Sequence, residues 1–188
     1  MFTNNWFEVT GKANFEKYVL PLKRESSIPM KMSALEFLEI GCYEGQASVW
    51  MLKNTQAELT VVDTFKGGQD LPDEVDLLNR FNENTKDFVN DINVKIGKSS
   101  YILKTLIKDT YDFIYIDGSH LASDVLEDGV LAFSLLKKGG IMIFDDYTWG
   151  QGLDIYERPC FGIDSFVQVY WNQLEVLERN SQLILKKI

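Results

Sequence analysis

The chain is poor in the residues that build sulfur or imidazole sites, with two cysteines and a single histidine among 188 residues. Cys42 and Cys160 lie far apart without metal-ligand spacing, so we expect free thiols in a reducing compartment. No stretch approaches the roughly 18 apolar residues of a membrane-spanning helix, and the start lacks the basic, apolar pattern of a signal peptide. These absences predict a cytoplasmic protein that does not bind membranes.

Positive charge is also scarce, because 19 Lys and Arg face 28 Asp and Glu, for a net charge of −9. Such a surface repels phosphate backbones, so we do not expect nucleic acid as a partner. The apolar share of 45% and the charged share of 25% are typical of a globular protein. We expect a single domain over residues 1–188, with residues 1–33 as an N-terminal cap or lid.

Short apolar runs alternate with longer stretches of helical period, which is the pattern of parallel strands joined by crossover helices. A polar turn between two short runs near the end predicts a closing hairpin with an antiparallel strand. We therefore predict an α/β fold: Rossmann-like, doubly wound, with a mostly parallel seven-stranded sheet and an antiparallel C-terminal hairpin strand. The clearest strands are expected at 34–40, 59–63, 93–96, 111–117, 139–145, 174–178 and 183–187.

The turn after the first strand contains Gly41 and Gly45 and precedes a helix, whose free N–H groups can approach a ligand. Asp63 ends the second strand, 22 residues after Gly41, where a carboxylate can accept hydrogen bonds from both ribose hydroxyls. This pattern fits a nucleoside-like ligand. The alternative is that the two glycines serve only to form the turn. The G-x-G-x-x-G spacing of nicotinamide-binding turns is missing.

At these residues the sequence resembles the class I S-adenosylmethionine-dependent methyltransferases. Within that class it is similar to the small metal-dependent O-methyltransferases, both the catechol O-methyltransferase type and the macrolide-sugar type. The segment Leu38-Glu-Ile-Gly-Cys-Tyr-Glu-Gly45 looks like their first motif, Val62-Asp63 like their ribose-binding strand end, and Gly97-Lys-Ser99 like their adenine-side segment. The resemblance covers nearly all of the chain from about residue 34 onward.

The resemblance implies S-adenosyl-L-methionine as cofactor and assigns a part of it to each matching residue. Glu39 would contact the methionine end, and Gly41, Tyr43 and Gly45 would shape its pocket. Asp63 would hold the ribose, and Ser99 the adenine. Asp117, which ends the fourth strand, would also lie against the cofactor.

A second group of residues, Asp117-x-x-His120 and Asp145-Asp146, ends two neighbouring strands and carries the expected chemistry. Three carboxylates so close would repel one another, and a divalent metal would relieve this, with Mg²⁺ first and Ca²⁺ or Mn²⁺ as alternatives. In similar enzymes the metal also takes the acceptor hydroxyl, and His120 would be the general base. The acids could instead cap a helix, form a polar turn, or offset the sulfonium charge without any metal.

The sequence thus predicts an O-methyltransferase acting on a hydroxyl of a small molecule, which could be a sugar, a polyol or a phenol. The catechol-contacting acid of the similar enzymes has no match, which favours a sugar or polyol. One alternative is a metal-independent methyltransferase of nitrogen or carboxyl acceptors. Another is a nonenzymatic Rossmann-like nucleotide-binding module. The exposed hairpin edge is compatible with a homodimer.

Overall fold

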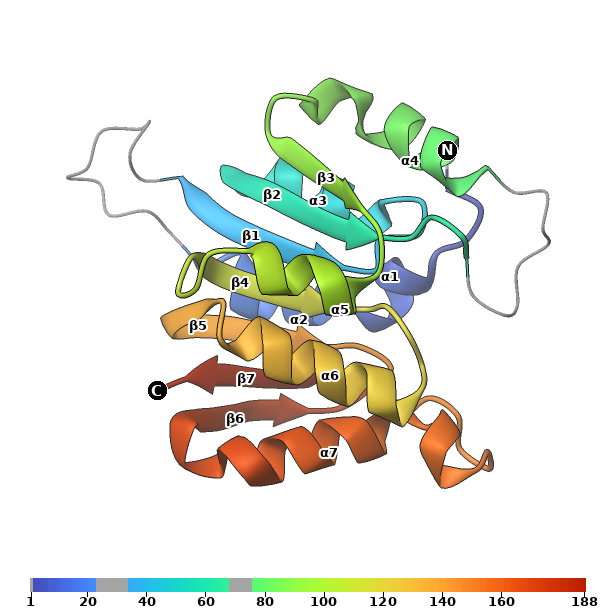
Figure 1. Ribbon diagram of the computed structural model, residues 1–188. Helices are drawn as coiled ribbons and strands as arrows, with labels where there is room; N and C mark the ends of the chain where they lie inside the picture. Colours follow the sequence, from blue (N-terminus) through green and yellow to red (C-terminus); the bar gives the residue numbers. More distant parts are fainter. Residues whose placement is uncertain (1, 23–33, 68–75) are drawn as a thin grey trace.

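The computed structural model describes residues 2–22, 34–67 and 76–188, which form a seven-stranded sheet with helices on both faces (Figure 1). The strand order is β3-β2-β1-β4-β5-β7-β6. The first five strands run parallel, and β7 pairs antiparallel with both β5 and β6. The bounds are β1 Leu35–Ile40, β2 Ala57–Asp63, β3 Ile92–Ile96, β4 Tyr111–Ile116, β5 Leu136–Phe144, β6 Leu174–Arg179 and β7 Leu183–Lys187. The predicted fold class is confirmed.

The helices cover the sheet in two layers, with α5, α6 and α7 on the near face in Figure 1 and α1, α2 and α3 behind the strands. None of the helices in the described ranges is long and apolar enough to cross a membrane. The bounds are α1 Trp6–Thr10, α2 Lys12–Asn14, η1 Phe15–Val19, α3 Gln46–Asn54, α4 Leu77–Thr85, η3 Lys86–Phe88, α5 Ser99–Ile102, η4 Leu103–Thr105, α6 Ala122–Phe133, η5 Ile155–Glu157, α7 Pro159–Tyr170 and η6 Trp171–Gln173.

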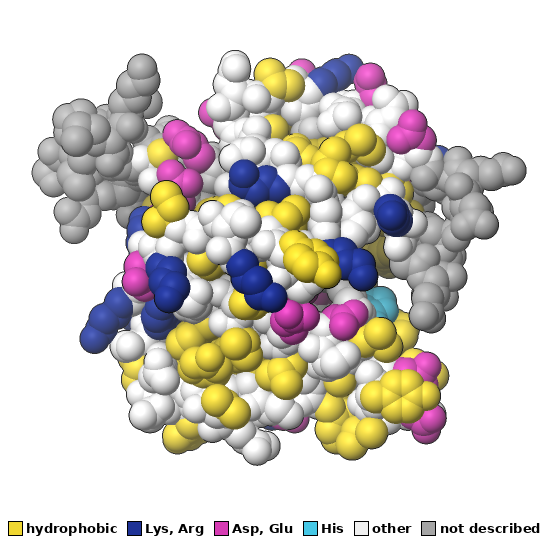
Figure 2. All heavy atoms as spheres, viewed as in Figure 1, with side chains coloured by type: hydrophobic (Ala, Val, Ile, Leu, Met, Phe, Trp, Pro, Cys, Tyr) yellow, Lys and Arg dark blue, Asp and Glu magenta, His cyan; other side chains and the backbone are white. Residues whose placement is uncertain are grey.

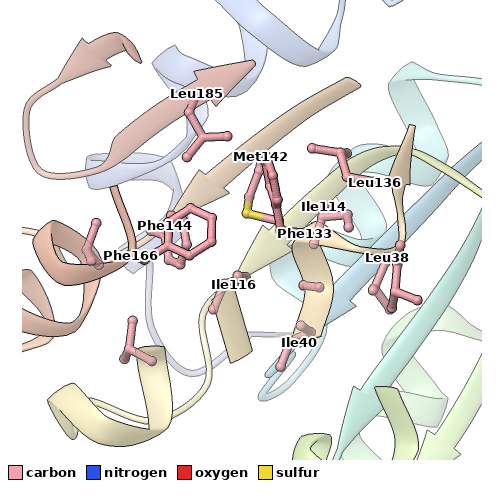
Figure 3. Packing of buried hydrophobic residues seen from close by; sticks show 14 of the residues in the cluster. Leu38, Ile40, Ile114, Ile116, Phe133, Leu136, Met142, Phe144, Phe166 and Leu185 are labelled. Carbon is pink, nitrogen blue, oxygen red and sulfur yellow. The ribbon is translucent and has the colours of Figure 1, made fainter. Parts of the chain in front are cut away.

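The core follows from the period of two along the strands, because alternate side chains point to opposite faces of the sheet. On the near face, apolar side chains of the strands pack against α6 and α7. Figure 3 shows Phe144 of β5 beside Phe166 of α7. The other face packs Phe37 and Phe113 against the N-terminal segment and α3. Both faces are apolar, which is why the central strands read as nearly continuous hydrophobic runs.

The N-terminal segment packs on the sheet. Phe7 and Phe15 lie in the part of the chain expected to form a cap or lid, and both rings are buried in the core. Phe15 meets Phe113 and Tyr115 edge to face, so the segment covers the sheet itself. Helical periodicity identifies an apolar face but not the surface against which it packs. The remainder of the proposed cap, residues 1 and 23–33, lies outside the described residues.

Candidate active site

The candidate site lies at the carboxyl edge of the sheet, where β1 and β4 are neighbours and the chain leaves them toward opposite faces. In open α/β sheets this reversal of strand order is where ligands bind. The edge is held together beyond the strands, since the N–H of Asp117 donates to the carbonyl of Ile40 at 2.8 Å. The N–H of Asp145 likewise donates to Ile116 at 2.9 Å. Backbone hydrogen bonds therefore hold together the strand ends that carry the predicted site residues.

The turn from β1 to α3 needs its two glycines for different reasons. Gly41 has a φ of +80°, and a Cβ there would lie 2.2 Å from the backbone oxygen of Asp117. Gly45 has a φ of +81°, and its Cβ would lie 2.9 Å from the ring of Phe81. Tyr43 between them also has a positive φ, of 50°, which residues other than glycine seldom adopt. The turn is thus tightly packed and partly strained, as functional turns often are.

Asp63 ends β2 and turns its carboxylate toward this turn. One oxygen accepts from the N–H of Cys42 at 2.7 Å and from that of Tyr43 at 3.3 Å, and the other accepts from the N–H of Phe65 at 2.7 Å. A carboxylate offers about four lone-pair positions, so three backbone bonds leave room for a hydroxyl donor. Asp63 therefore both holds the turn and remains suited to the predicted ribose contact.

Glu39 lies beneath the turn, on the face of β1 that meets α3. Its side chain is 1% exposed and accepts a short hydrogen bond from the hydroxyl of Ser48. Burial raises the pKa of Glu39 to about 8, and the nearby charge of Asp63 adds to the effect. The carboxyl therefore carries a proton at neutral pH and would ionise more easily beside a cationic ligand group.

The raised pKa of Glu39 predicts a pH dependence of folding stability. The unfolded chain releases this proton near pH 4.5, whereas the folded chain keeps it until about pH 8. The free energy of unfolding should therefore fall between these pH values, by on the order of 1.4 kcal/mol per pH unit. Urea unfolding at pH 5, 6, 7 and 8 should show a shallower fall for Glu39→Gln than for the wild type. Parallel curves would contradict the assignment.

Ser99 begins α5 after β3, as the adenine-side segment requires. Its hydroxyl bonds the carboxyl of Asp128 on α6, a residue that is 4% exposed. Burial raises the pKa of Asp128 to about 6, although the bond from Ser99 partly opposes this. Ser99 is thereby fixed between α5 and α6, and its predicted role in holding adenine stays a prediction.

The acids at the ends of β4 and β5 influence one another but have separate partners. Tyr115 donates a short hydrogen bond to one oxygen of Asp145, and the N–H of Asp146 donates to the other at 2.8 Å. The pKa of Asp117 lies well above its usual range, because the site removes water from the carboxylate and Asp145 and Asp146 repel its charge. Burial and the charge of Asp146 also raise the pKa of Asp145. These raised pKa values favour the protonated carboxyls, and a cationic ligand at this edge would favour their ionised forms.

His120 pairs with Asp146 across this edge. Its Nε2 lies 2.9 Å from a carboxylate oxygen of Asp146, which takes a φ of 55°. The ring of Trp149 lies against the imidazole, with 4.1 Å between ring centroids. Figure 2 shows the single cyan residue, His120, bordered by acidic and hydrophobic atoms at one side of the visible face. The imidazole is held by a carboxylate, as in many general bases.

The predicted metal ligands fit a divalent cation in chemical type but not in their present arrangement. Carboxylate oxygens are preferred by Mg²⁺ and Ca²⁺. Among the residues that the structure describes, however, no three His, Cys, Asp or Glu side chains converge closely enough to hold an ion. Asp145 is engaged by Tyr115 and Asp146 by His120. The metal site formed by Asp117, Asp145 and Asp146 remains a prediction.

Three contributors were missed by the sequence analysis. Tyr115 holds Asp145, Trp149 covers His120, and Glu44 inside the turn is buried and charged. An acid between the two turn glycines was visible in the sequence. Its partners were not, because they come from distant segments.

The seven-stranded sheet, with its antiparallel β7, has the strand order of a Rossmann-like methyltransferase fold. A family model described as "Methyltransferase domain" matches residues 38–147, which is more than half of the chain. The chain belongs to this family. The matched segment runs from β1 past the end of β5 and thus includes nearly every residue discussed above.

Other known proteins resemble the chain more distantly. Uncharacterized protein R132 of Acanthamoeba polyphaga mimivirus is 32% identical over 123 residues, or 60% of this chain and 52% of that protein. The chain thus spans about half the length of this curated relative. A putative O-methyltransferase from Klebsiella pneumoniae superposes with a TM-score of 0.65 at 16% identity, covering 82% of this chain and 73% of that one. The O-methyltransferase TomG from Streptomyces achromogenes, solved in complex with SAM, gives 0.64 at the same identity and coverage.

Proposed function

We propose that the protein transfers the methyl group of S-adenosylmethionine to a hydroxyl of a small molecule, with His120 as the general base. The observation that carries this proposal is the His120–Asp146 pair at 2.9 Å, next to the cofactor edge of the sheet. A base is needed because a neutral hydroxyl is a weak nucleophile. Two solved structures of similar fold are named as O-methyltransferases, and we extend their oxygen acceptor to this chain as part of the proposal.

The cofactor fits the residues of the turn. Gln46, the first residue of α3, has a buried side-chain oxygen without a hydrogen-bond partner in the described part of the chain. The methionine ammonium of S-adenosylmethionine is a donor of the kind this oxygen lacks. The acids around Asp117 suit the positive sulfonium. We assign the methionine end to Glu39 and the turn, the ribose to Asp63, and the adenine to Ser99.

The proposed reaction is a single displacement at the methyl carbon of the cofactor. When bound, the cofactor supplies a methyl group on a positively charged sulfur. The carboxylate of Asp146 would accept a hydrogen bond from the Nε2–H of His120 and so hold the neutral ring in place. His120 would take the acceptor's hydroxyl proton as the acceptor oxygen gains the methyl group, and the electron pair of the broken carbon–sulfur bond would go to the departing sulfur. Asp146 would then stabilise the imidazolium, against which the ring of Trp149 lies.

We also propose that a divalent metal held by Asp117, Asp145 and Asp146 assists the acceptor hydroxyl. The donor types of Asp117, Asp145 and Asp146 favour it, but their present arrangement does not. A metal-independent enzyme is the second candidate, and the pairing of Asp146 with His120 specifically favours that candidate.

Methyl transfer with and without metal separates the two candidates. The purified protein would be incubated with S-adenosylmethionine carrying a labelled methyl group and a panel of sugars, polyols, phenols, amines and carboxylic acids. One arm contains Mg²⁺ and the other a chelator. Metal assistance predicts that the chelator abolishes transfer to any hydroxyl that is methylated with Mg²⁺. Equal transfer in both arms would establish the metal-independent mechanism, and transfer only to amines or carboxylates would overturn the hydroxyl assignment.

A further inference from the structure

We infer that Glu44 is a positioning residue for the cofactor, because its buried carboxylate ties the glycine turn to α4 and to the N-terminal segment. The inference rests on the cofactor site proposed above and adds residues to it that touch no part of the proposed chemistry. It concerns the shape of the turn over residues 41–45, on which the methionine end of the cofactor would lie.

Glu44 is 1% exposed, yet it remains charged because it has partners. Its two oxygens accept from the N–H of Thr3 at 2.8 Å, from the hydroxyl of Thr3 at 2.9 Å, and from a guanidinium nitrogen of Arg80 at 2.6 Å. Burial alone would raise the pKa of Glu44, but these bonds hold it below its usual range. A fully paired buried carboxylate fixes the groups around it.

Further contacts join the same three segments. The side chain of Asn84 on α4 donates to the backbone oxygen of Glu44 at 2.9 Å. Trp6 of α1 lies over Tyr43, with 5.8 Å between ring centroids. On the opposite side the turn is held by Asp63, which accepts from two of its N–H groups. The turn is therefore clamped between the end of β2 and a cover made of α4 and the N-terminal segment.

Only a carboxylate satisfies this arrangement. The N–H of Thr3 bonds one oxygen and the guanidinium of Arg80 bonds the other, and both groups are obligatory donors. A glutamine at position 44 would set its own NH₂ group against one of these donors. Glu44→Gln should therefore loosen one side of the clamp while nearly preserving side-chain volume.

The location of the clamp predicts which part of the cofactor is affected. The turn leads into α3, whose first residue Gln46 carries the unpartnered oxygen assigned to the methionine ammonium. The ribose is assigned to Asp63, on the opposite side of the turn from the contacts of Glu44. Loss of the clamp should therefore weaken binding of S-adenosylhomocysteine, which has an amino-acid end. It should spare 5′-methylthioadenosine, which lacks that end.

The test is a pair of calorimetric titrations, one with each nucleoside, on the wild type, Glu44→Gln and Arg80→Met. Arg80 has a side chain that is 43% exposed, so Arg80→Met keeps the test valid if Glu44→Gln does not fold. The control is Lys86→Met, since Lys86 is 66% exposed and lies 3.9 Å from Glu83. We expect the dissociation constant for S-adenosylhomocysteine to rise about tenfold in both variants. The values for 5′-methylthioadenosine, and both values for the control, should stay within about twofold.

Each other outcome has a definite meaning. Unchanged affinity for S-adenosylhomocysteine in folded variants would overturn the role of Glu44. Equal weakening toward both nucleosides would overturn it as well, because it would indicate general loosening of the fold. A wild type that binds neither nucleoside would instead remove the proposed cofactor site itself.

Discussion

Replacing His120 by alanine is expected to lower kcat by roughly 10² to 10⁴, which is the usual contribution of a positioned general base. The affinity for S-adenosylhomocysteine should be unchanged, because the imidazole pairs with Asp146 and Trp149 on the acceptor side of the edge. The measurement is the initial rate of methyl transfer under saturating cofactor, combined with a calorimetric titration of each variant.

His120→Gln separates proton transfer from packing. Glutamine can donate to Asp146 and can lie against Trp149, but it cannot take the acceptor's proton. We expect it to be as slow as His120→Ala. Turnover close to that of the wild type in either variant would remove His120 as the base. Activity restored only by glutamine would mean that the imidazole serves to hold Asp146.

The second large effect is expected at Asp63. Asp63→Ala should weaken binding of S-adenosylhomocysteine by about 1.5 to 3 kcal/mol, through the loss of charged hydrogen bonds. The structure strengthens this expectation, because the same carboxylate accepts from the N–H groups of Cys42 and Tyr43 and so supports the turn.

The two nucleosides used for Glu44 also test Asp63. Because Asp63 is assigned to the ribose, its loss should weaken S-adenosylhomocysteine and 5′-methylthioadenosine alike. Glu44→Gln, in contrast, should affect only the former. Unchanged affinity for both nucleosides in Asp63→Ala would show that the ribose lies elsewhere. Weakening confined to S-adenosylhomocysteine would mean that Asp63 acts through the turn alone.

The sheet was predictable from the sequence because its signal is local. A strand such as Tyr111–Ile116 is identified by its apolar run, and acids such as Asp117 and Asp145 follow directly where such runs end. The last residues of parallel strands lie at one edge of the sheet, so the sequence alone could predict that the site residues lie together. The closing hairpin followed equally from two runs around a polar turn.

The partners of these acids were not predictable. Whether Asp146 faces a metal or His120 depends on its own backbone, which takes a φ of 55° in the structure, and no residue pattern encodes that angle. The clamp on Glu44 joins residues 3, 44 and 80, whose contact requires the whole fold. Phe15 lies in the segment expected to form a cap or lid, but its position in the core is set by the shape of the sheet. Strand ends can be predicted from local sequence patterns, whereas side-chain partners depend on contacts between distant segments.

The central claim is that this edge of the sheet binds the S-adenosylmethionine nucleoside, and a titration of the wild type tests it most directly. Calorimetry would be performed with S-adenosylhomocysteine, with Mg²⁺ and with a chelator in turn, and with NAD as the control ligand. The account predicts micromolar binding of S-adenosylhomocysteine in both conditions and no binding of NAD. Binding of NAD alone, or of neither ligand, would contradict the account. The glycine turn and Asp63 would then not form a methyltransferase cofactor site.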